Sequence, residues 1–227
     1  MKIGIIGSGN IGSTLVRHLT NLGHDVKIAN SRGPESLEDL ATETGAAAVT
    51  AEEAAAAEDL VIITIPEKSI PELPTDVLSA SKAIIVDTGN YYPSRDGELK
   101  EIVAGTPDSA WVASVIGHPV IKAFNNIYAA SLAEKGAPVG SPNRVALSLA
   151  GDDESQKQVV MQLIDAIGFD VIDTGSLSDS WKQEPGSPAY CNDLSKEALK
   201  QALDNADHSK RAEYRKAADD QLRAMLS

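Results

Sequence analysis

A glycine-rich turn near the start of the chain limits the possible folds more than any other stretch; it reads Gly7-Ser8-Gly9-Asn10-Ile11-Gly12. The turn follows a short apolar run, residues 2–6, which predicts a strand, and precedes residues 13–22, whose spacing predicts a helix. In that context Gly7 permits a tight turn, Gly9 lets the backbone approach a pyrophosphate, and Gly12 lets the helix pack closely on the strand. The N–H groups at the helix start favour an anion. We therefore expect these six residues to form a dinucleotide site; the alternative is a strand–helix turn that is merely rich in glycine.

Further apolar runs alternate with helical segments along the chain. The predicted strands are residues 25–29, 46–49, 59–66, 83–87, 119–124, 144–150 and 169–175. The predicted helices are residues 36–44, 51–57, a segment around Val77, 111–116, 129–140 with its loop, 154–167, and two polar helices within 195–226. This alternation predicts an α/β fold with a doubly wound, mainly parallel sheet. In the helix 154–167 we expect Val159, Leu163 and Ile167 to face inward.

The pattern changes after residue 128. Small residues dominate 129–140, and the strands beyond them end in two polar helices. We therefore expect a dinucleotide-binding domain at residues 1–128. A smaller C-terminal part, residues 129–227, would pack on it as an α/β and helical extension.

The end of the second predicted strand indicates which dinucleotide binds. A site for NAD normally has Asp or Glu there, about twenty residues past the glycines, to bond the ribose 2′-hydroxyl. This chain has Asn30-Ser31-Arg32-Gly33 instead. Arginine supplies a charge-assisted fork for a 2′-phosphate and serine a neutral donor. The sequence thus favours NADP over NAD, held by Ser31 and Arg32, unless Arg32 is only a solvated loop residue.

Other strand ends supply further candidates, because ligands of open α/β sheets bind at the carboxyl ends of the strands. The residues that we expect to line the cofactor site there are Ile65, Pro66, Asn90, Asn125 and Asn126. Asn90 can donate to a nicotinamide carboxamide or a ribose. Its neighbour Asp87 can equally be a residue that forms a turn, and the sequence leaves both interpretations open.

Composition excludes several other classes of protein. The chain has 227 residues and a net charge of -13, which argues against nucleic acid and anionic membrane as partners. No apolar run is long enough to span a bilayer, and the start shows no signal peptide. The single cysteine, Cys191, excludes an internal disulfide, and the four histidines have no ligand spacing, so no metal site is predicted. We expect a cytoplasmic location.

Catalytic residues are not identifiable from the sequence. His118 and Lys122 are the acid–base candidates, and Lys122 can equally be a structural strand residue. Cys191 is expected to be a small buried residue rather than a catalytic thiol, since no base pattern accompanies it. Four aromatic residues can either form the wall of a flat substrate's site or pack at element ends; they are Tyr91, Tyr92, Trp181 and Tyr190.

Several strand ends together resemble one family. The glycine turn, Asn30-Ser31-Arg32, the run Val120-Ile121-Lys122-Ala123-Phe124-Asn125-Asn126-Ile127, Gly151-Asp152-Asp153 and Asp173-Thr174-Gly175-Ser176-Leu177 are similar to the NADP oxidoreductases dependent on the deazaflavin coenzyme F-420. The ferric reductase domain of the STEAP proteins looks related. The resemblance extends from Met1 to about Leu177, and the combination of Lys-Ala-Phe-Asn with Asn-Ser-Arg is its most specific part.

This resemblance implies a Rossmann domain with a small C-terminal part, a homodimer, and NADP bound through the glycine turn, Ser31 and Arg32. A deazaflavin or flavin acceptor would stack face to face with the nicotinamide. Two departures stand out: Glu35 and Ser36 occupy a region where some relatives carry a further basic residue, and the tail around residues 185–190 resembles a bacterial branch. The resemblance therefore supports NADP and hydride transfer better than it supports the second substrate.

The function expected from the sequence is an NADP(H)-dependent oxidoreductase that transfers hydride between the nicotinamide and a deazaflavin or flavin-type acceptor. Such chemistry needs orientation of two rings more than acid–base groups, because the cofactors carry the reaction. The alternatives are an NADPH-dependent reductase of a small imine or carbonyl substrate and a non-catalytic NADP-binding module. The residues after Ser178 are few for the long helical substrate domain that the imine and carbonyl reductases usually carry.

Overall fold

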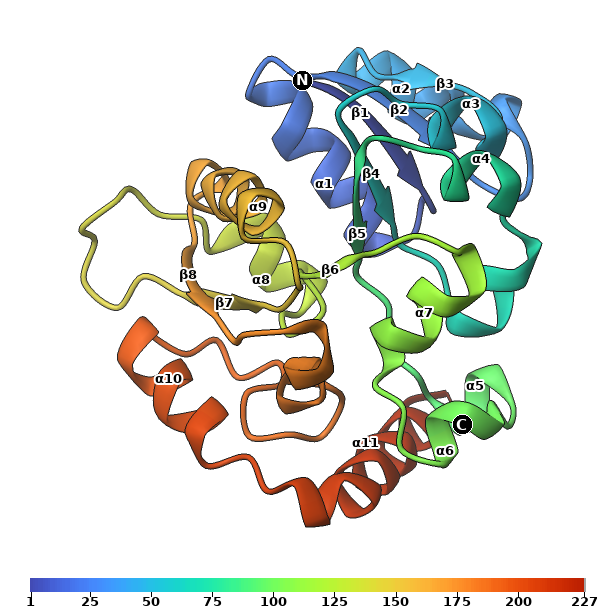
Figure 1. Cartoon of the computed structure of the whole chain (residues 1–227). Helices are drawn as coiled ribbons and strands as arrows, with labels where there is room; N and C mark the ends of the chain where they lie inside the picture. The colour runs from blue at the N-terminus through green and yellow to red at the C-terminus, as the bar shows by residue number, and fades with distance from the viewer. Residues whose placement is uncertain (227) are drawn as a thin grey trace.

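A six-stranded, wholly parallel sheet organises the N-terminal part of the chain, in the order β3-β2-β1-β4-β5-β6 (Figure 1). The computed structural model describes residues 1–226, with side chains to residue 225. The strands are β1 (Lys2–Ile6), β2 (Asp25–Ala29), β3 (Ala47–Ala48), β4 (Leu60–Ile63), β5 (Ile84–Asp87) and β6 (Ile121–Lys122). The predicted doubly wound parallel sheet of the Rossmann type is thus confirmed, with β3 at the edge and β6 shorter than expected.

Helices cover both faces of this sheet. They are α1 (Asn10–Asn21), α2 (Glu38–Thr44), α3 (Ala51–Ala55), α4 (Thr75–Ser79), α5 (Pro93–Asp96), α6 (Lys100–Val103) and α7 (Asp108–Ile116), with 3-10 turns at Pro34–Leu37 and Glu67–Glu72. Local sequence explains individual helix ends: Thr50 and Glu53 form a capping box that begins α3. Helix α1 begins at Asn10, inside the glycine motif and earlier than expected.

Strand β4 shows how one sequence run serves two cores. Leu60 and Ile62 belong to a cluster with residues of α1, whereas Val61 and Ile63 belong to a cluster with residues of α3, α4 and α7. Successive side chains of a strand point to opposite faces of its sheet. All four residues are fully buried, which is why β4 reads as a continuous apolar run.

The C-terminal part adds a two-stranded parallel sheet, β7 (Ala146–Leu149) and β8 (Asp170–Asp173). Its helices are α8 (Ala129–Glu134), α9 (Glu154–Ile167), α10 (Lys196–Asp204) and α11 (Arg211–Leu226), with 3-10 turns at Leu177–Gln183 and His208–Lys210. An antiparallel bridge between Lys122 and Ala150 joins the small sheet to the end of β6. The proposed boundary after residue 128 stays a prediction, and residue 227 lies outside the described residues.

One hydrophobic cluster unites the two parts. It contains Ile5 and Leu15 from the first part together with Leu147 and Phe169 from the second. In Figure 1, α8 and α9 accordingly lie on the same side of the large sheet as α1.

The inward face of α9 differs from the prediction in one residue. Val159 is only half-buried, whereas Val160, Leu163, Ile164 and Ile167 are buried. A spacing of four residues drifts around a helix with 3.6 residues per turn, so Val159 lies at the edge of the buried stripe. The expectation for Leu163 and Ile167 is confirmed, and that for Val159 is wrong.

The C-terminal helix α11 packs beneath the segment that follows β5, beside α5 and α6 (Figure 1). Arg211 donates to the carbonyl of Gly105 at 2.7 Å, and Arg215 donates to that of Ile102 at 3.2 Å. Asp219 accepts from the N–H of Ser94 at 2.8 Å. The end of the chain therefore supports a loop that leads from the carboxyl edge of the sheet.

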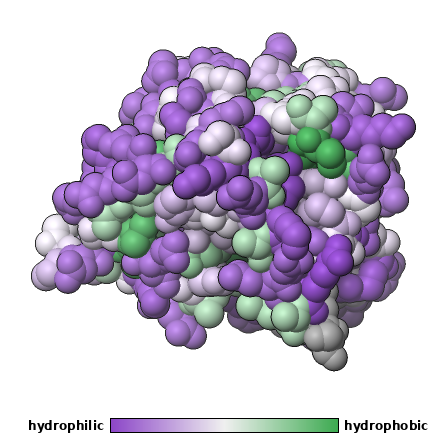
Figure 2. All heavy atoms as spheres, turned by 90° about the horizontal axis from the view of Figure 1, so that it is seen from below, coloured by the Kyte–Doolittle hydropathy of each residue, from purple (hydrophilic) through white to green (hydrophobic). Residues whose placement is uncertain are grey.

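The surface in Figure 2 is mostly hydrophilic, and its hydrophobic residues form small, separate areas. None of the helices in residues 1–226 combines the length and the apolar character that crossing a membrane requires.

Phe169→Ala should destabilise the whole chain, because the fully buried ring lies in the cluster shared by both parts. We expect a loss of about 3–5 kcal/mol in the free energy of unfolding, measured by urea denaturation as one shifted transition. Val139→Ala is the matched control, since Val139 is 75% exposed and its loss should matter little. A shift of only part of the unfolding signal would show that the two parts do not share a core.

Candidate functional site

The glycine turn brings α1 against the end of β4. Gly7 has a φ of 118°, and a side chain there would overlap the backbone of Thr64. A side chain at Gly12 would overlap the carbonyl of Gly7. The Thr64 hydroxyl donates to the Gly7 carbonyl at 2.8 Å. Glycine is therefore required at both positions for the helix to start where it does.

Gly9 differs from its two neighbours in the motif. A side chain added there would meet no atom within 4 Å, so this glycine faces open space. It is the N-cap of α1, with no side-chain cap and no acidic residue in the first turn. Uncapped N–H groups and the positive end of the helix dipole thus face an open surface, which fits an anionic pyrophosphate.

Asn30 connects the glycine turn to the loop after β2. Its amide nitrogen donates to the hydroxyls of Ser8 at 3.0 Å and Ser36 at 2.9 Å, and its side-chain oxygen accepts from the N–H of Arg32 at 2.9 Å. Sequence reasoning placed Asn30 at the strand end without giving it a role. Its position is the signal that could have found it, since Asn forms such turns readily.

A cavity of about 300 Å³ lies beside this loop. It is lined by Ile6, Gly7, Ser8, Asn30, Ser31, Arg32, Ala51, Ile65, Pro66, Ser69, Glu72 and Leu73. Ser31 and Arg32 are exposed, and within residues 1–226 the Arg32 guanidinium has no hydrogen bond or ion pair. The charge of Arg32 is therefore available to a ligand. Glu72 lines the same cavity.

A second cavity, of about 380 Å³, lies on the other side of the turn and shares Ile65 and Pro66 with the first. Its other lining residues are Gly9, Asn10, Ile11, Thr64, Thr88, Gly89, Asn90, Tyr92, Arg95, Phe124, Asn125, Ile127, Tyr128, Ala129, Tyr190 and Cys191. The two hollows together follow the carboxyl edge of the sheet. We call them the ribose-side cavity and the ring-side cavity.

Asn90 and Asn125 meet in the ring-side cavity. The Asn125 amide donates to the side-chain oxygen of Asn90 at 3.0 Å and to the carbonyl of Gln183 at 2.7 Å. Asn90 in turn donates to the Asn125 carbonyl at 3.1 Å. The two strand ends are thereby tied to each other and to the C-terminal part.

Asn126 and Gly12 do not line either cavity. Asn126 is buried, and its amide donates to the Ala189 carbonyl at 3.3 Å while its own carbonyl accepts from the N–H of Cys191 at 3.0 Å. It holds the segment that carries Tyr190. The remaining predicted residues do line the hollows.

Two of the four predicted aromatic residues face the ring-side cavity. The hydroxyls of Tyr92 and Tyr190 lie 2.6 Å apart. Tyr91 is fully buried and Trp181 packs edge-on against His208, so both belong to the packing alternative. Thr64, Thr88 and Tyr128 also line this cavity and were missed, although all three directly follow apolar or strand segments.

Buried charges support the floor of the ring-side cavity. The Lys122 ammonium is fully buried, 3.3 Å from the Asp87 carboxylate, and donates to the Gly89 carbonyl. Asp87 accepts from the N–H of Gly89 at 2.9 Å, which is the turn-forming role, and from the hydroxyl of Ser109. Burial is the largest single influence and opposes the charge of Lys122, but the nearby carboxylates, Asp87 first among them, together outweigh it and the pKa of Lys122 is raised. Lys122 is thus a structural residue, and His118 lines neither cavity.

Glu67 lies behind Gly89. One carboxyl oxygen accepts from Arg95 at 2.8 Å, and within the described chain the other has no partner. Burial, with the charges of Asp108 and Asp87, raises the pKa of Glu67 well above its usual value. The buried Glu67 carboxyl therefore keeps its proton to a higher pH than an exposed glutamate does.

Cys191 also lines the ring-side cavity. Its side chain is buried, and burial raises the pKa of the thiol to about 12. Its backbone has a φ of 51°, which the bond from its N–H to Asn126 helps to hold. The expectation of a small buried residue is confirmed. A thiol that stays protonated is also a poor nucleophile.

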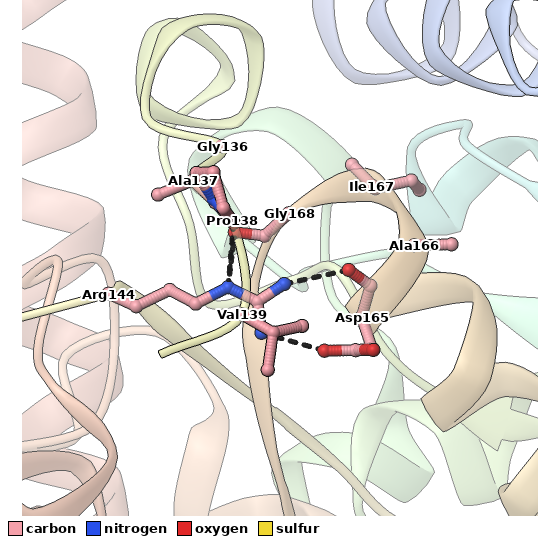
Figure 3. Close-up of a pocket in the computed structure, with 9 residues that line it drawn as sticks. All are labelled: Gly136, Ala137, Pro138, Val139, Arg144, Asp165, Ala166, Ile167 and Gly168. Atoms are coloured by element: carbon pink, nitrogen blue, oxygen red, sulfur yellow. Dashed lines mark hydrogen bonds and ion pairs between the residues drawn. The ribbon is translucent and has the colours of Figure 1, made fainter. Parts of the chain in front are cut away.

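A third hollow lies in the C-terminal part around Arg144 (Figure 3). The Arg144 guanidinium donates to Asp165 at 2.7 Å, to Asp170 at 2.9 Å, and to the carbonyls of Ala137 and Gly168. The arginine holds two loops together and offers little charge to a ligand. Among residues 1–226, no group of three His, Cys, Asp or Glu side chains is arranged to hold a metal.

The fold and the two cavities define a dinucleotide-binding α/β protein. Residues 2–91 match the family model described as NADP oxidoreductase coenzyme F420-dependent. Over these residues the chain has the sequence of this family, which supports an NAD(P)-dependent oxidoreductase.

Three relatives illustrate the match. A hypothetical protein of Sinorhizobium meliloti, SMa0349, is 30% identical with a TM-score of 0.72, over 86% of this chain and 96% of that one. A putative F420-dependent NADP-reductase from Arthrobacter sp. FB24 is similar in fold, with 24% identity and a TM-score of 0.65 over 79% of this chain and 87% of that one. Rat metalloreductase STEAP3 is 28% identical over 81% of this chain. The chain spans 36% of STEAP3 and less than two thirds of the other curated relatives it matches.

Glu67→Gln should change how stability depends on pH. Because the folded-state pKa of Glu67 lies above its usual value of 4.5, the folded protein keeps a proton that the unfolded chain loses. Wild-type stability present below pH 4.5 is therefore lost as the pH rises toward the folded-state pKa, with a limiting slope of about 1.4 kcal/mol per pH unit. Glutamine stays neutral and lacks this loss.

The measurement is the free energy of urea unfolding for wild type and variant between pH 4 and pH 8. We expect the variant to gain stability relative to wild type as the pH rises. The exposed residue Glu52, changed to Gln, is the control and should give parallel curves. Parallel curves for Glu67→Gln itself would contradict a raised pKa of Glu67.

Proposed function

We propose that this protein is an NADP(H)-dependent oxidoreductase that transfers hydride between the nicotinamide and a flat acceptor of the deazaflavin (coenzyme F420) or flavin type. The observation that carries the proposal is the pair of cavities that flank one glycine turn and share Ile65 and Pro66. Such a divided hollow suits a molecule with two ends joined by a pyrophosphate.

The ribose-side cavity supports NADP over NAD. The Arg32 guanidinium has no partner within residues 1–226, and the preceding residue, Ser31, lines the same cavity. A guanidinium and a hydroxyl suit a 2′-phosphate. No carboxylate follows β2 directly, so the group that would bond a free 2′-hydroxyl is replaced.

The ring-side cavity would receive the nicotinamide and the acceptor. When bound, NADPH supplies the hydride, and the chain's own residues orient the rings. The amides of Asn90 and Asn125 can hydrogen-bond the polar edge of one ring. Ile11, Phe124 and Ile127 exclude water from the cavity. Proximity of the two rings is the main contribution that we assign to the protein.

The alternatives are a reductase of a small imine or carbonyl compound and a module that binds NADP without turnover. A homodimer and a cytoplasmic location remain predictions. The first experiment is to titrate the protein with NADPH and then add deazaflavin or FMN, following absorbance of the nicotinamide. Oxidation of NADPH with either ring supports the proposal, and tight binding without turnover of either ring argues for one of the alternatives.

Arg32→Glu should weaken NADPH binding by at least about tenfold and NADH binding little, because it removes a phosphate partner and adds repulsion. The dissociation constants can be measured by nicotinamide fluorescence. Lys68→Glu, an exposed charge change outside both cavities, is the control. Equal losses for NADPH and NADH would contradict the assignment of Arg32 to the 2′-phosphate.

Gly9→Val should abolish binding of both NADPH and NADH while the protein stays folded. The site accepts a side chain without overlap, and the extended backbone of Gly9 suits valine. The added methyl groups would occupy the space in front of the helix N-terminus. Unfolding in urea should be nearly unchanged, and full NADPH affinity in the folded variant would remove the glycine turn from the site.

A further inference from the structure

The ring-side cavity contains an unusual pair of donors. The hydroxyls of Tyr92 and Tyr190 lie 2.6 Å apart, and both side chains line the cavity. They come from distant parts of the chain, the loop after β5 and the segment before α10. Neither is brought here by sequence proximity, so the pair is a product of the tertiary structure.

Neighbouring residues fix the position of each tyrosine. The N–H of Tyr92 donates to Asp96 at 3.0 Å, and the Arg95 guanidinium lies 5.3 Å from the centre of the Tyr92 ring. Asn126 bonds the residues on both sides of Tyr190, through the Ala189 carbonyl and the Cys191 N–H. The hydroxyls are therefore preorganised before any ligand arrives.

Counting hydrogens shows what the pair can offer. Burial raises the pKa of Tyr92 to about 12 and also raises that of Tyr190, so both are protonated at neutral pH. The neighbouring Cys191 thiol is protonated as well. Two hydroxyl groups that bond each other use one of their two hydrogens in that bond. The other hydrogen is left to donate to an atom outside the pair.

The charges around the cavity restrict the acceptor. Within residues 1–226, none of the lining residues carries a carboxylate, and Arg95 is the charged one. Arg95 is already paired with Asp96 and Glu67, at 2.8 Å in each case. A cationic substrate such as a protonated imine would find no counter-charge here, whereas an oxygen that gains negative charge would find a donor.

We propose that the Tyr92–Tyr190 pair donates a hydrogen bond to a carbonyl oxygen of an uncharged acceptor ring, and so selects carbonyl-bearing rings over iminium substrates. This inference rests on the proposed function. Hydride leaves the nicotinamide with both electrons of its C–H bond and forms a new C–H bond on a deazaflavin or a new N–H bond on a flavin. The negative charge moves to the carbonyl oxygen, where the pair stabilises it, and a proton from water then neutralises the anion. The two tyrosines remain protonated throughout.

The test uses 4-nitrophenolate, a flat ring with an anionic oxygen, titrated into the full-length protein loaded with NADP and followed by its absorbance. We expect the double variant Tyr92→Phe/Tyr190→Phe to bind the phenolate at least about tenfold more weakly, as expected for a lost hydrogen bond to a charged group. Each single variant should lose less, because the remaining hydroxyl is freed to donate. NADPH affinity should stay as in wild type.

Tyr214→Phe is the control. Tyr214 belongs to α11 and lines neither cavity. We expect it to bind the phenolate like wild type, and we expect benzylamine, a cationic ring, to bind wild type much more weakly than the phenolate does. If the double variant also loses its affinity for NADPH, the phenolate affinities of the single variants are compared with that of wild type instead.

The inference is overturned if wild type does not bind the phenolate, if variants that retain NADPH affinity bind it as tightly as wild type, or if benzylamine binds equally well. Turnover of NADPH by wild type with deazaflavin or FMN is measured separately. Its absence would count against the proposed function, whereas loss of the tyrosine effect on phenolate binding counts against the donor pair.

Discussion

The close approach of the glycine turn to the end of β4 is the contact on which the rest of the site depends. Gly7 and Gly12 have no room for a side chain, and the Thr64 hydroxyl bonds the Gly7 carbonyl. This contact places the start of α1 at the carboxyl edge of the sheet, with its free N–H groups facing outward. Ile65 and Pro66, which follow Thr64, then separate two cavities that would otherwise be one open groove.

A second layer of buried charge keeps the floor of the ring-side cavity in place. Lys122 is fully buried between Asp87 and the Gly89 carbonyl, and the buried Glu67 behind them has a raised pKa. Breaking such a buried pair leaves an uncompensated charge, which is far more costly than the pair itself is stabilising. Lys122, an acid–base candidate in the sequence, is thus better explained as a support for the strand ends.

Much of the site follows from local rules, and a part of it does not. Residues 7–11 of the glycine turn, Arg32 and the strand-end residues line the two cavities as sequence reasoning expects, because parallel strands end at a common edge. These strand-end residues are Pro66, Asn90 and Asn125. Asn126 was assigned to the cofactor by the same rule, but the next residue in a chain points elsewhere, and here it holds the segment that carries Tyr190. Whether the lining residues bind NADP is for the titrations to decide.

By itself the sequence determined most strands and helices and the parallel orientation of the strands. Apolar periodicity, caps and glycines act over a few residues and can therefore be recognised in the sequence. The inward face of α9 was placed correctly except at its edge, at Val159. Only the tertiary structure decided that Tyr92 meets Tyr190, that the pKa of Glu67 is raised, and that α11 supports the loop after β5. These features depend on contacts between residues far apart in the chain, and burial and pairing in three dimensions set their chemistry.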